Sequence, residues 1–91
     1  MGKKRSRVDI IGDMLLSIQQ KRGRIKPTHL MYKANLSHDQ LKGYLEELVE
    51  KEFVSSMETP EHNTYILITD KGCKFLQKWQ EMKQFETSFG F

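Results

Sequence analysis

The side chains that could support catalysis or hold a metal ion are few and scattered along the chain. His29, His38 and His62 lie far apart in sequence and share no metal-ligand spacing with the single cysteine, Cys73. The tripeptide SHD at 37–39 contains the residue types of a nucleophilic triad, but adjacency in sequence does not create the geometry of one. There is also no glycine-rich phosphate loop. We therefore expect no enzymatic activity, metal or cofactor, and the sequence indicates no small-molecule ligand.

The remaining chemistry is electrostatic, because lysine and arginine are concentrated in the first third of the sequence. Residues 1–33 carry nine lysines and arginines against two aspartates, a net charge of +7, whereas residues 34–91 carry a net charge of −4. Such asymmetry is typical of a basic face that binds a polyanion, although a solvated lysine-rich surface has the same composition. The sequence has no bilayer-spanning apolar run and no secretory signal, so we expect an intracellular protein without a membrane partner.

The first half of the sequence is predicted to form three helices that could position these charges. Apolar residues from 8 to 18 recur at the spacing of one helix face, and Gly23 follows as a helix stop. Residues 25 and 26 should be extended, because they precede a proline. That proline can open a short second helix, which ends at Asn35, a residue that tolerates left-handed geometry.

The third helix, residues 37–51, is predicted to begin at a strong N-terminal cap. Ser37 is followed three residues later by Gln40, which completes a capping box. Leucines at 41, 45 and 48 follow at helical spacing and should face the core. The outward face then consists of Asp39, Lys42, Gly43, Glu46 and Glu50. Glycine within a helix costs about 1 kcal/mol relative to alanine, and its expected role here is to leave the outer face of the helix without an obstructing side chain.

The second half of the sequence is predicted to form a β-hairpin and a final helix. FVSSME and TYILIT are rich in β-branched and aromatic residues and flank the turn cluster TPEHN. Thr69 caps the last helix. This order predicts an α+β fold, a winged helix-turn-helix of three helices and a β-hairpin wing with an added C-terminal helix. We divide the chain into a flexible basic arm (1–7), a winged helix-turn-helix domain (8–69) and a C-terminal dimerisation helix (70–91).

Two stretches carry a family resemblance, THLMYKANLSHDQLKGYLEELVEKEFV and YILITDKGCKFLQKW. They resemble the small archaeal winged helix-turn-helix DNA-binding proteins, which are transcriptional-regulator-like or chromatin-associated. The resemblance implies a double-stranded DNA binder with the 37–51 helix in the major groove. It also implies a homodimer formed by the last helix as an antiparallel coiled coil, and a cytoplasmic, nucleoid-associated location. The sequence departs from the family pattern at Glu52, where a glycine usually closes the recognition helix, and at the acidic wing tip, residues 58–63.

The candidate DNA-binding residues fall into three groups: the basic arm, the basic segment around the first turn, and the front of the two helix-turn-helix helices. They are Lys3, Lys4, Arg5 and Arg7; Arg22, Arg24 and Lys26; and Thr28, Lys33, Ser37, His38, Gln40 and Lys42. Glutamine can pair bidentately with adenine and lysine can reach guanine, while the other cations and hydroxyls suit phosphate. For the arm we favour phosphate contact, and the alternatives are a solubilising disordered tail or, in a eukaryotic cell, a nuclear localisation signal.

The last helix carries more apolar surface than one small domain can cover. Phe75, Leu76 and Trp79 should pack on the first helix, leaving further apolar residues exposed. The candidate dimer interface is Trp79, Met82, Phe85 and Phe89. The main alternative function is a protein–protein interaction module that uses this apolar helix without reading DNA, and RNA binding is a weaker third hypothesis.

Overall fold

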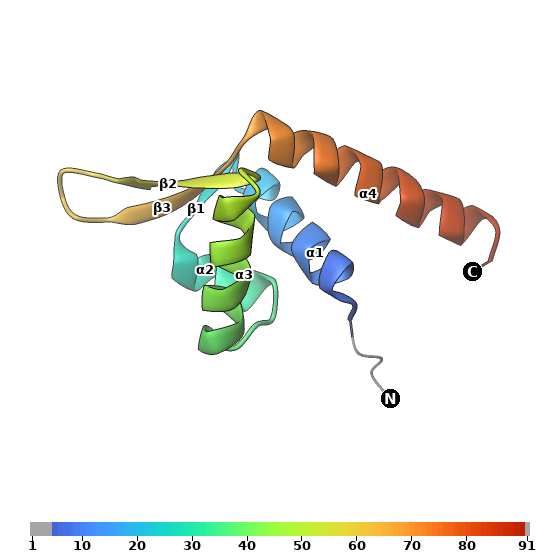
Figure 1. The fold of residues 1–91 in the computed structure, drawn as a ribbon, viewed down its shortest axis with the longest axis horizontal. Coiled ribbons are helices and arrows are strands. Elements are labelled where there is room, and N and C mark those ends of the chain that lie inside the picture. Colours follow the sequence, from blue (N-terminus) through green and yellow to red (C-terminus); the bar gives the residue numbers. More distant parts are fainter. Residues whose placement is uncertain (1–4, 91) are drawn as a thin grey trace.

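The computed structural model describes residues 5–90, in which a bundle of three helices lies between a projecting wing and a long last helix (Figure 1). The elements are α1 (Arg7–Gln20), β1 (Arg24–Ile25), α2 (Pro27–Lys33), α3 (His38–Glu50), β2 (Val54–Glu58), β3 (Thr64–Ile68) and α4 (Asp70–Ser88). The wing and α4 extend in opposite directions from the bundle, which gives the molecule its longest dimension of 49 Å. No helix in the described residues is long and apolar enough to cross a membrane.

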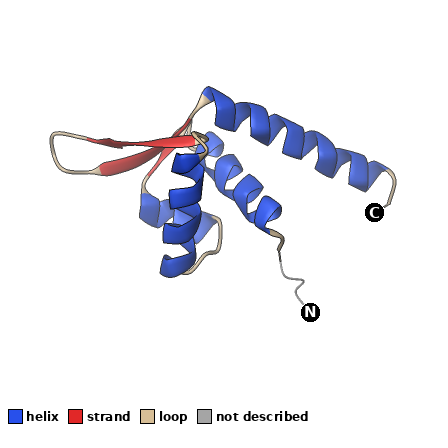
Figure 2. Cartoon of the chain, in the orientation of Figure 1, coloured by secondary structure: helices blue, strands red, loops and turns tan. Residues whose placement is uncertain are grey.

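The sheet has three antiparallel strands in the order β1-β3-β2 (Figure 2). The hairpin pairs Val54 with Ile68 at its base and Glu58 with Thr64 near its tip. The predicted extended piece before α2 is itself a short strand, which pairs with the outer side of β3. The expected α+β winged helix-turn-helix with an added C-terminal helix is confirmed, and the pairing of the short extended piece with β3 is the feature that the sequence had not predicted.

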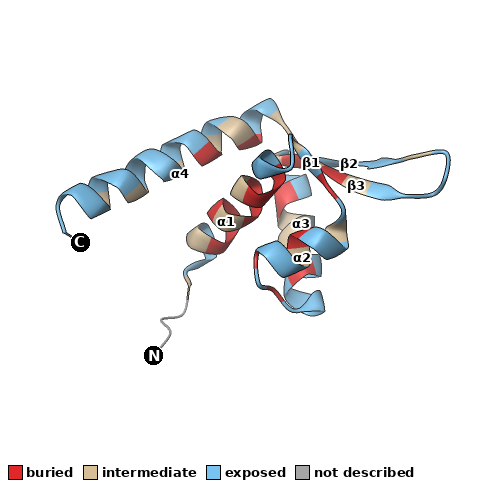
Figure 3. Cartoon of the chain, turned by 180° about the vertical axis from the view of Figure 1, so that it is seen from behind, coloured by how far each residue is buried: buried red, intermediate tan, exposed pale blue. Residues whose placement is uncertain are grey.

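The core lies where α1 crosses the other helices and the base of the sheet (Figure 3). The six largest fully buried side chains there are Met14, Leu15, Ile18, Leu30, Leu48 and Leu76. These residues come from α1, α2, α3 and α4, so burial of one shared apolar cluster fixes α3 against the rest of the domain. Phe53 and Phe75 extend this cluster at the edge of α4, with ring centroids 4.9 Å apart.

Three helices end in the same left-handed turn, and none of them uses glycine at the first left-handed position. Arg22, Asn35 and Glu52 have φ angles of 62°, 56° and 63°. After α3, the Phe53 amide donates to the Leu48 carbonyl and the Glu52 amide to the Val49 carbonyl, which is the Schellman pattern. The prediction for Asn35 is confirmed. At the end of α1, both Arg22 and the predicted stop residue Gly23 have positive φ, and the Gly23 amide donates to the Ile18 carbonyl.

A compact junction joins the end of α3, the start of the wing and the start of α4. The Thr69 hydroxyl donates to the Glu52 carbonyl at 2.6 Å, and the Thr69 amide donates to the Phe53 carbonyl at 3.0 Å. The same hydroxyl accepts the Gly72 amide and so caps α4, as predicted. A Cβ atom at Gly72 would lie 2.2 Å from the Phe53 carbonyl oxygen, so only glycine permits this approach.

Candidate nucleic-acid interface

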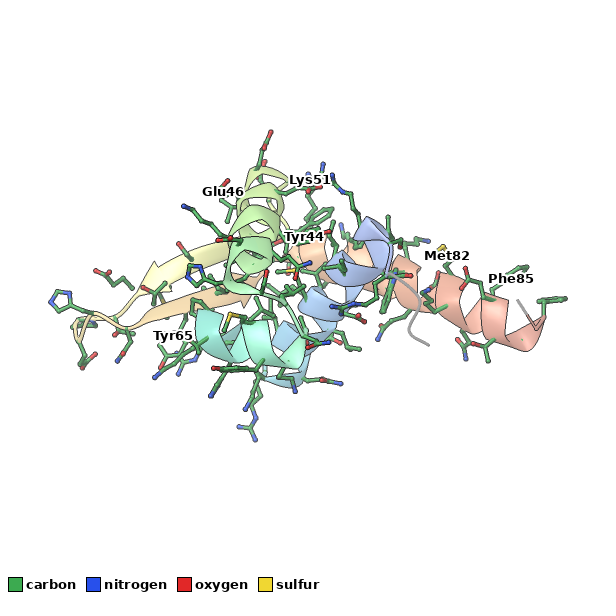
Figure 4. All side chains as sticks on the ribbon, turned by 90° about the horizontal axis from the view of Figure 1, so that it is seen from below. Tyr44, Glu46, Lys51, Tyr65, Met82 and Phe85 are labelled. Carbon is green, nitrogen blue, oxygen red and sulfur yellow. The ribbon has the colours of Figure 1, made fainter. Side chains whose placement is uncertain are left out.

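Helix α3 presents the outward face that the sequence predicted. Ser37 and Gln40 form the capping box, and Leu41 and Leu48 are buried. The exposed side consists of Asp39, Lys42, Gly43, Glu46 and Glu50. Its first turns therefore carry a histidine and a lysine, while its glutamates follow toward the C-terminal end. Figure 4 shows Glu46 on the side of α3 that is turned away from α2.

The capping box constrains what Gln40 can recognise. Its amide oxygen accepts the Ser37 backbone amide at 2.9 Å, while the Gln40 backbone amide donates to the Ser37 hydroxyl at 3.2 Å. Bidentate pairing with adenine needs both the oxygen and the nitrogen of the side-chain amide. Reading adenine would therefore break half of the cap, whereas His38 and Lys42 are exposed and have no such role in the fold.

Within residues 5–90, no packing contact requires glycine at position 43. A Cβ atom built at this position meets no heavy atom within 4 Å. Beside it lies a shallow hollow of about 260 Å³ between the start of α1 and α3, lined by Arg7, Asp39, Gln40, Gly43, Tyr44 and Glu47. The glycine thus leaves the front of α3 open within residues 5–90, and the close approach of another molecule to the backbone stays a prediction.

Two of the expected arm cations are held within the fold, so the predicted arm of residues 1–7 needs correction at its end. Ser6 caps α1 by accepting the Asp9 amide, and Arg7 is the first residue of that helix. Arg5 forms an ion pair with Asp13 at 2.9 Å and donates to the Asn35 carbonyl at 3.0 Å.

Arg7 forms an ion pair with Glu47 of α3. The Arg7–Glu47 pair and the Arg5–Asn35 hydrogen bond join residues 40 and 30 positions apart, and the charge count that predicted the arm had no means of identifying these partners. Lys3 and Lys4 lie outside the described residues.

The other predicted phosphate contacts lie on the surface. Arg22, Arg24, Lys26, Thr28 and Lys33 are all exposed, and within residues 5–90 none of these four cations forms an ion pair. Lys26 and Thr28 flank the first residue of α2, and helix α2 packs against β3. The Arg24 guanidinium lies over the Tyr65 ring, 4.7 Å from its centroid, an arrangement that the sequence pattern did not reveal.

The wing is acidic at its tip and has no cation of its own. Residues 54–68 contain Glu58 and Glu61 but neither lysine nor arginine. The turn is closed within itself, because the Thr59 amide donates to the Asn63 carbonyl at 2.8 Å and the His62 amide donates to the Thr59 carbonyl at 2.9 Å. Among the residues of strands β1, β2 and β3, the only lysine or arginine is Arg24 of β1.

The predicted dimer interface divides into a covered part and an exposed part. Trp79 packs on Gly12, where an added Cβ atom would lie 2.3 Å from the indole, and its ring nitrogen donates to Asp9 at 3.2 Å. Lys83 forms an ion pair with the same carboxylate at 2.8 Å, and this hydrogen bond lowers the pKa of Asp9 below its ordinary value of 3.8. Trp79 is thus mainly an internal contact between α1 and α4, as its predicted packing on the first helix required.

The apolar residues beyond Trp79 are open to solvent. The exposed fractions of Met82, Phe85 and Phe89 are 44%, 57% and 67%, and the rings of the two phenylalanines lie 4.7 Å apart. Met82 and Phe85 point from the same side of α4 in Figure 4. An apolar groove of about 160 Å³ continues from them toward α1 and is lined by Val8, Phe75, Lys78, Trp79 and Met82.

Comparison with known proteins identifies the family. The sequence profile of the winged helix-turn-helix family matches residues 4–87, nearly the whole chain. The chain belongs to this family. No curated protein sequence matches it. Within residues 5–90 no cluster of histidine, cysteine, aspartate and glutamate side chains could hold a metal ion.

Solved structures with the same winged helix-turn-helix fold include archaeal and viral DNA-binding proteins. Sso10a-2, a DNA-binding protein from Sulfolobus solfataricus, has a TM-score of 0.81 and 19% identity over 93% of this chain and 85% of its own. F93 from STIV, a winged-helix DNA-binding protein, has a TM-score of 0.74 and 18% identity over 91% and 92%. MepR, a transcription regulator from Staphylococcus aureus, has a TM-score of 0.69 and 19% identity over 88% and 63%. The resemblance inferred from the sequence is confirmed at the level of the fold.

Proposed function

We propose that this winged helix-turn-helix protein binds double-stranded DNA as a homodimer, with the first turns of α3 in the major groove. The observation that carries the proposal is the front of α3, where His38 and Lys42 are exposed beside a glycine that no packing requires. In helix-turn-helix proteins this end of the second helix approaches the base edges. The protein would act as a transcription regulator or a small chromatin protein on DNA in the cytoplasm, without chemistry of its own.

The surrounding charges and the similar proteins support the same function. Thr28 and Lys33 belong to the helix that crosses the phosphate backbone in this motif, and Lys26 immediately precedes it. The glutamates of α3 follow toward its far end, where they would be turned from the duplex. Two structures with this fold are described as DNA-binding proteins and a third as a transcription regulator.

The test is a titration with duplex DNA at several salt concentrations. A DNA binder should show log K falling linearly with log salt, by about 0.9 for each phosphate contacted. Lys42→Ala should weaken binding, whereas Lys74→Ala, which removes the same charge from an exposed position on α4, should not. Absence of binding by the unaltered protein at low salt would refute the proposal.

The dimer is proposed from the exposed apolar end of α4. Met82 and Phe89 lie seven residues apart, two helical turns, and so share one side of the helix. A second copy that covers this side is the simplest closed arrangement for such a surface. Light scattering should show a dimer for the unaltered protein and a monomer for Met82→Glu and Phe89→Glu, while an unchanged mass would eliminate this interface.

The alternative function, a protein–protein interaction module, is favoured by the acidic residues of the wing and of α3. The acidic wing tip and the glutamates of α3 would suit a protein partner better than a polyanion, and the exposed side of α4 could contact that partner. If the chain is such an interaction module, the DNA titration will show no binding at low salt although the protein is folded.

A further inference from the structure

The pairing register places Arg24 and Tyr65 on the outward side of the sheet. Arg24 lies opposite Leu67, and Tyr65 lies opposite Met57. Successive residues of a strand point to opposite faces, so Tyr65 and Leu67 share one face of β3 while the buried Ile66 faces the core. Figure 4 shows Tyr65 on the side of the wing near α2. The outward face therefore combines one cation with an aromatic ring.

The Arg24 side chain leans toward the tip of the wing. Its backbone pairs with Leu67, but its guanidinium lies over the ring of Tyr65, two residues nearer the tip, at 4.7 Å from the centroid. A guanidinium that rests on a ring face keeps its N–H edges available to an anion. Within the described residues Arg24 has no carboxylate partner that would compete for those edges.

Glu58, the acidic residue within the wing strands, does not oppose an anion on this face. Glu58 pairs with Thr64 and so lies on the other face from Tyr65, where its carboxylate contacts His62 at 3.8 Å. The residues of β2 that share the face of Tyr65 are Ser55 and Met57, which are uncharged. The outward face of the strands is thus positive, although the wing sequence taken alone is negative.

We propose that Tyr65 is a positioning residue that holds Arg24 against the wing, and that this pair supplies the wing's contact with a DNA phosphate. The proposal rests on the proposed DNA binding and adds to it the residue through which the acidic wing takes part. An arginine side chain has many rotamers, and holding one of them beforehand reduces the entropy lost when a phosphate is bound. Since β1 lies directly before α2, the same contact would continue the row of phosphate contacts expected at Lys26 and Thr28.

The test compares the salt dependence of duplex binding for four variants with that of the unaltered protein. For each wing that contacts DNA, Arg24→Ala should make the slope of log K against log salt less steep by about 0.9 and lower the affinity about eightfold at 0.1 M salt. Tyr65→Leu removes the ring but keeps an apolar side chain, and should lower the affinity by about two- to fivefold. Tyr65→Phe keeps the ring and should bind as the unaltered protein does.

The double variant Arg24→Ala with Tyr65→Leu decides whether the two residues act together. If Tyr65 acts through Arg24, the double variant should bind no more weakly than Arg24→Ala alone. Additive losses, or an unchanged salt slope in Arg24→Ala, would overturn the proposal while leaving DNA binding by α3 intact. No binding by the unaltered protein would overturn both. Lys74→Ala is the matched control for loss of one exposed positive charge, and circular dichroism verifies that each variant is folded.

Discussion

Replacing Gly43 by alanine should stabilise the fold and weaken DNA binding. An added Cβ atom at this position has no heavy atom within 4 Å, so the substitution introduces no internal clash. Position 43 lies within α3, where glycine is less favourable than alanine by about 1 kcal/mol. For a domain of this size, such a gain raises the midpoint of thermal unfolding by about 4–8 °C.

The effect on binding has the opposite sign if the backbone of α3 approaches the duplex. A methyl group forced into a close contact costs about 1–3 kcal/mol, which corresponds to a roughly five- to 150-fold loss of affinity. Calorimetry measures the first effect and fluorescence anisotropy with a labelled duplex measures the second. Glu50→Ala, on the outward side of α3 near its C-terminal end, is a control that should leave binding undiminished.

Each half of this reasoning can fail separately. A lower unfolding midpoint for Gly43→Ala would contradict the open space that the structure places in front of this glycine. A higher midpoint with unchanged affinity would show that the backbone at this position does not approach DNA, and the glycine would then have no explanation in binding.

Three further substitutions test the remaining structural arguments. Gly12→Ala should destabilise the protein by about 1–3 kcal/mol in urea denaturation, because the new methyl group overlaps the indole of Trp79 at 2.3 Å; an unchanged midpoint would contradict this contact. Glu52→Gly should raise the free energy of unfolding by about 0.5–1 kcal/mol. Glycine adopts the φ of 63° without the strain of a side chain, and this gain exceeds the extra entropy that glycine loses on folding. Lys83 lowers the pKa of Asp9, so the stability from this pair is present above pH 3.8 and is lost as the pH falls through the lower folded value. Asp9→Asn should therefore differ from the unaltered protein at pH 6 and converge with it in acid, whereas a difference independent of pH would refute the ion pair.

The features that the sequence could predict are those encoded by neighbouring residues. The Ser37 cap, the Asn35 turn and the leucine spacing of α3 each depend on side chains within one or two helical turns, and each prediction is confirmed. The exposure of Met82 and Phe85 was likewise predictable, because too many apolar residues were present for one contact face.

The features that escaped prediction depend on residues far apart in the chain. Arg7 and Glu47 are separated by 40 positions, and Arg24 meets Tyr65 only because β1 pairs with β3. A count of charges treats every arginine alike, whereas the fold neutralises some and leaves others free. The two-residue strand β1 is too short to show any periodicity, and only its register against β3 defines it.

The junction of Glu52, Phe53, Thr69 and Gly72 has a consequence for the spacing of the DNA half-sites that a pair of chains would bind. It fixes the direction of α4 relative to α3 through two hydrogen bonds and one glycine that no larger residue can replace. If two chains join along α4, this junction would hold the two α3 helices of the pair at a fixed separation. Such a protein would select target sites by the distance between their two halves, which for helices in successive major grooves is about 34–36 Å.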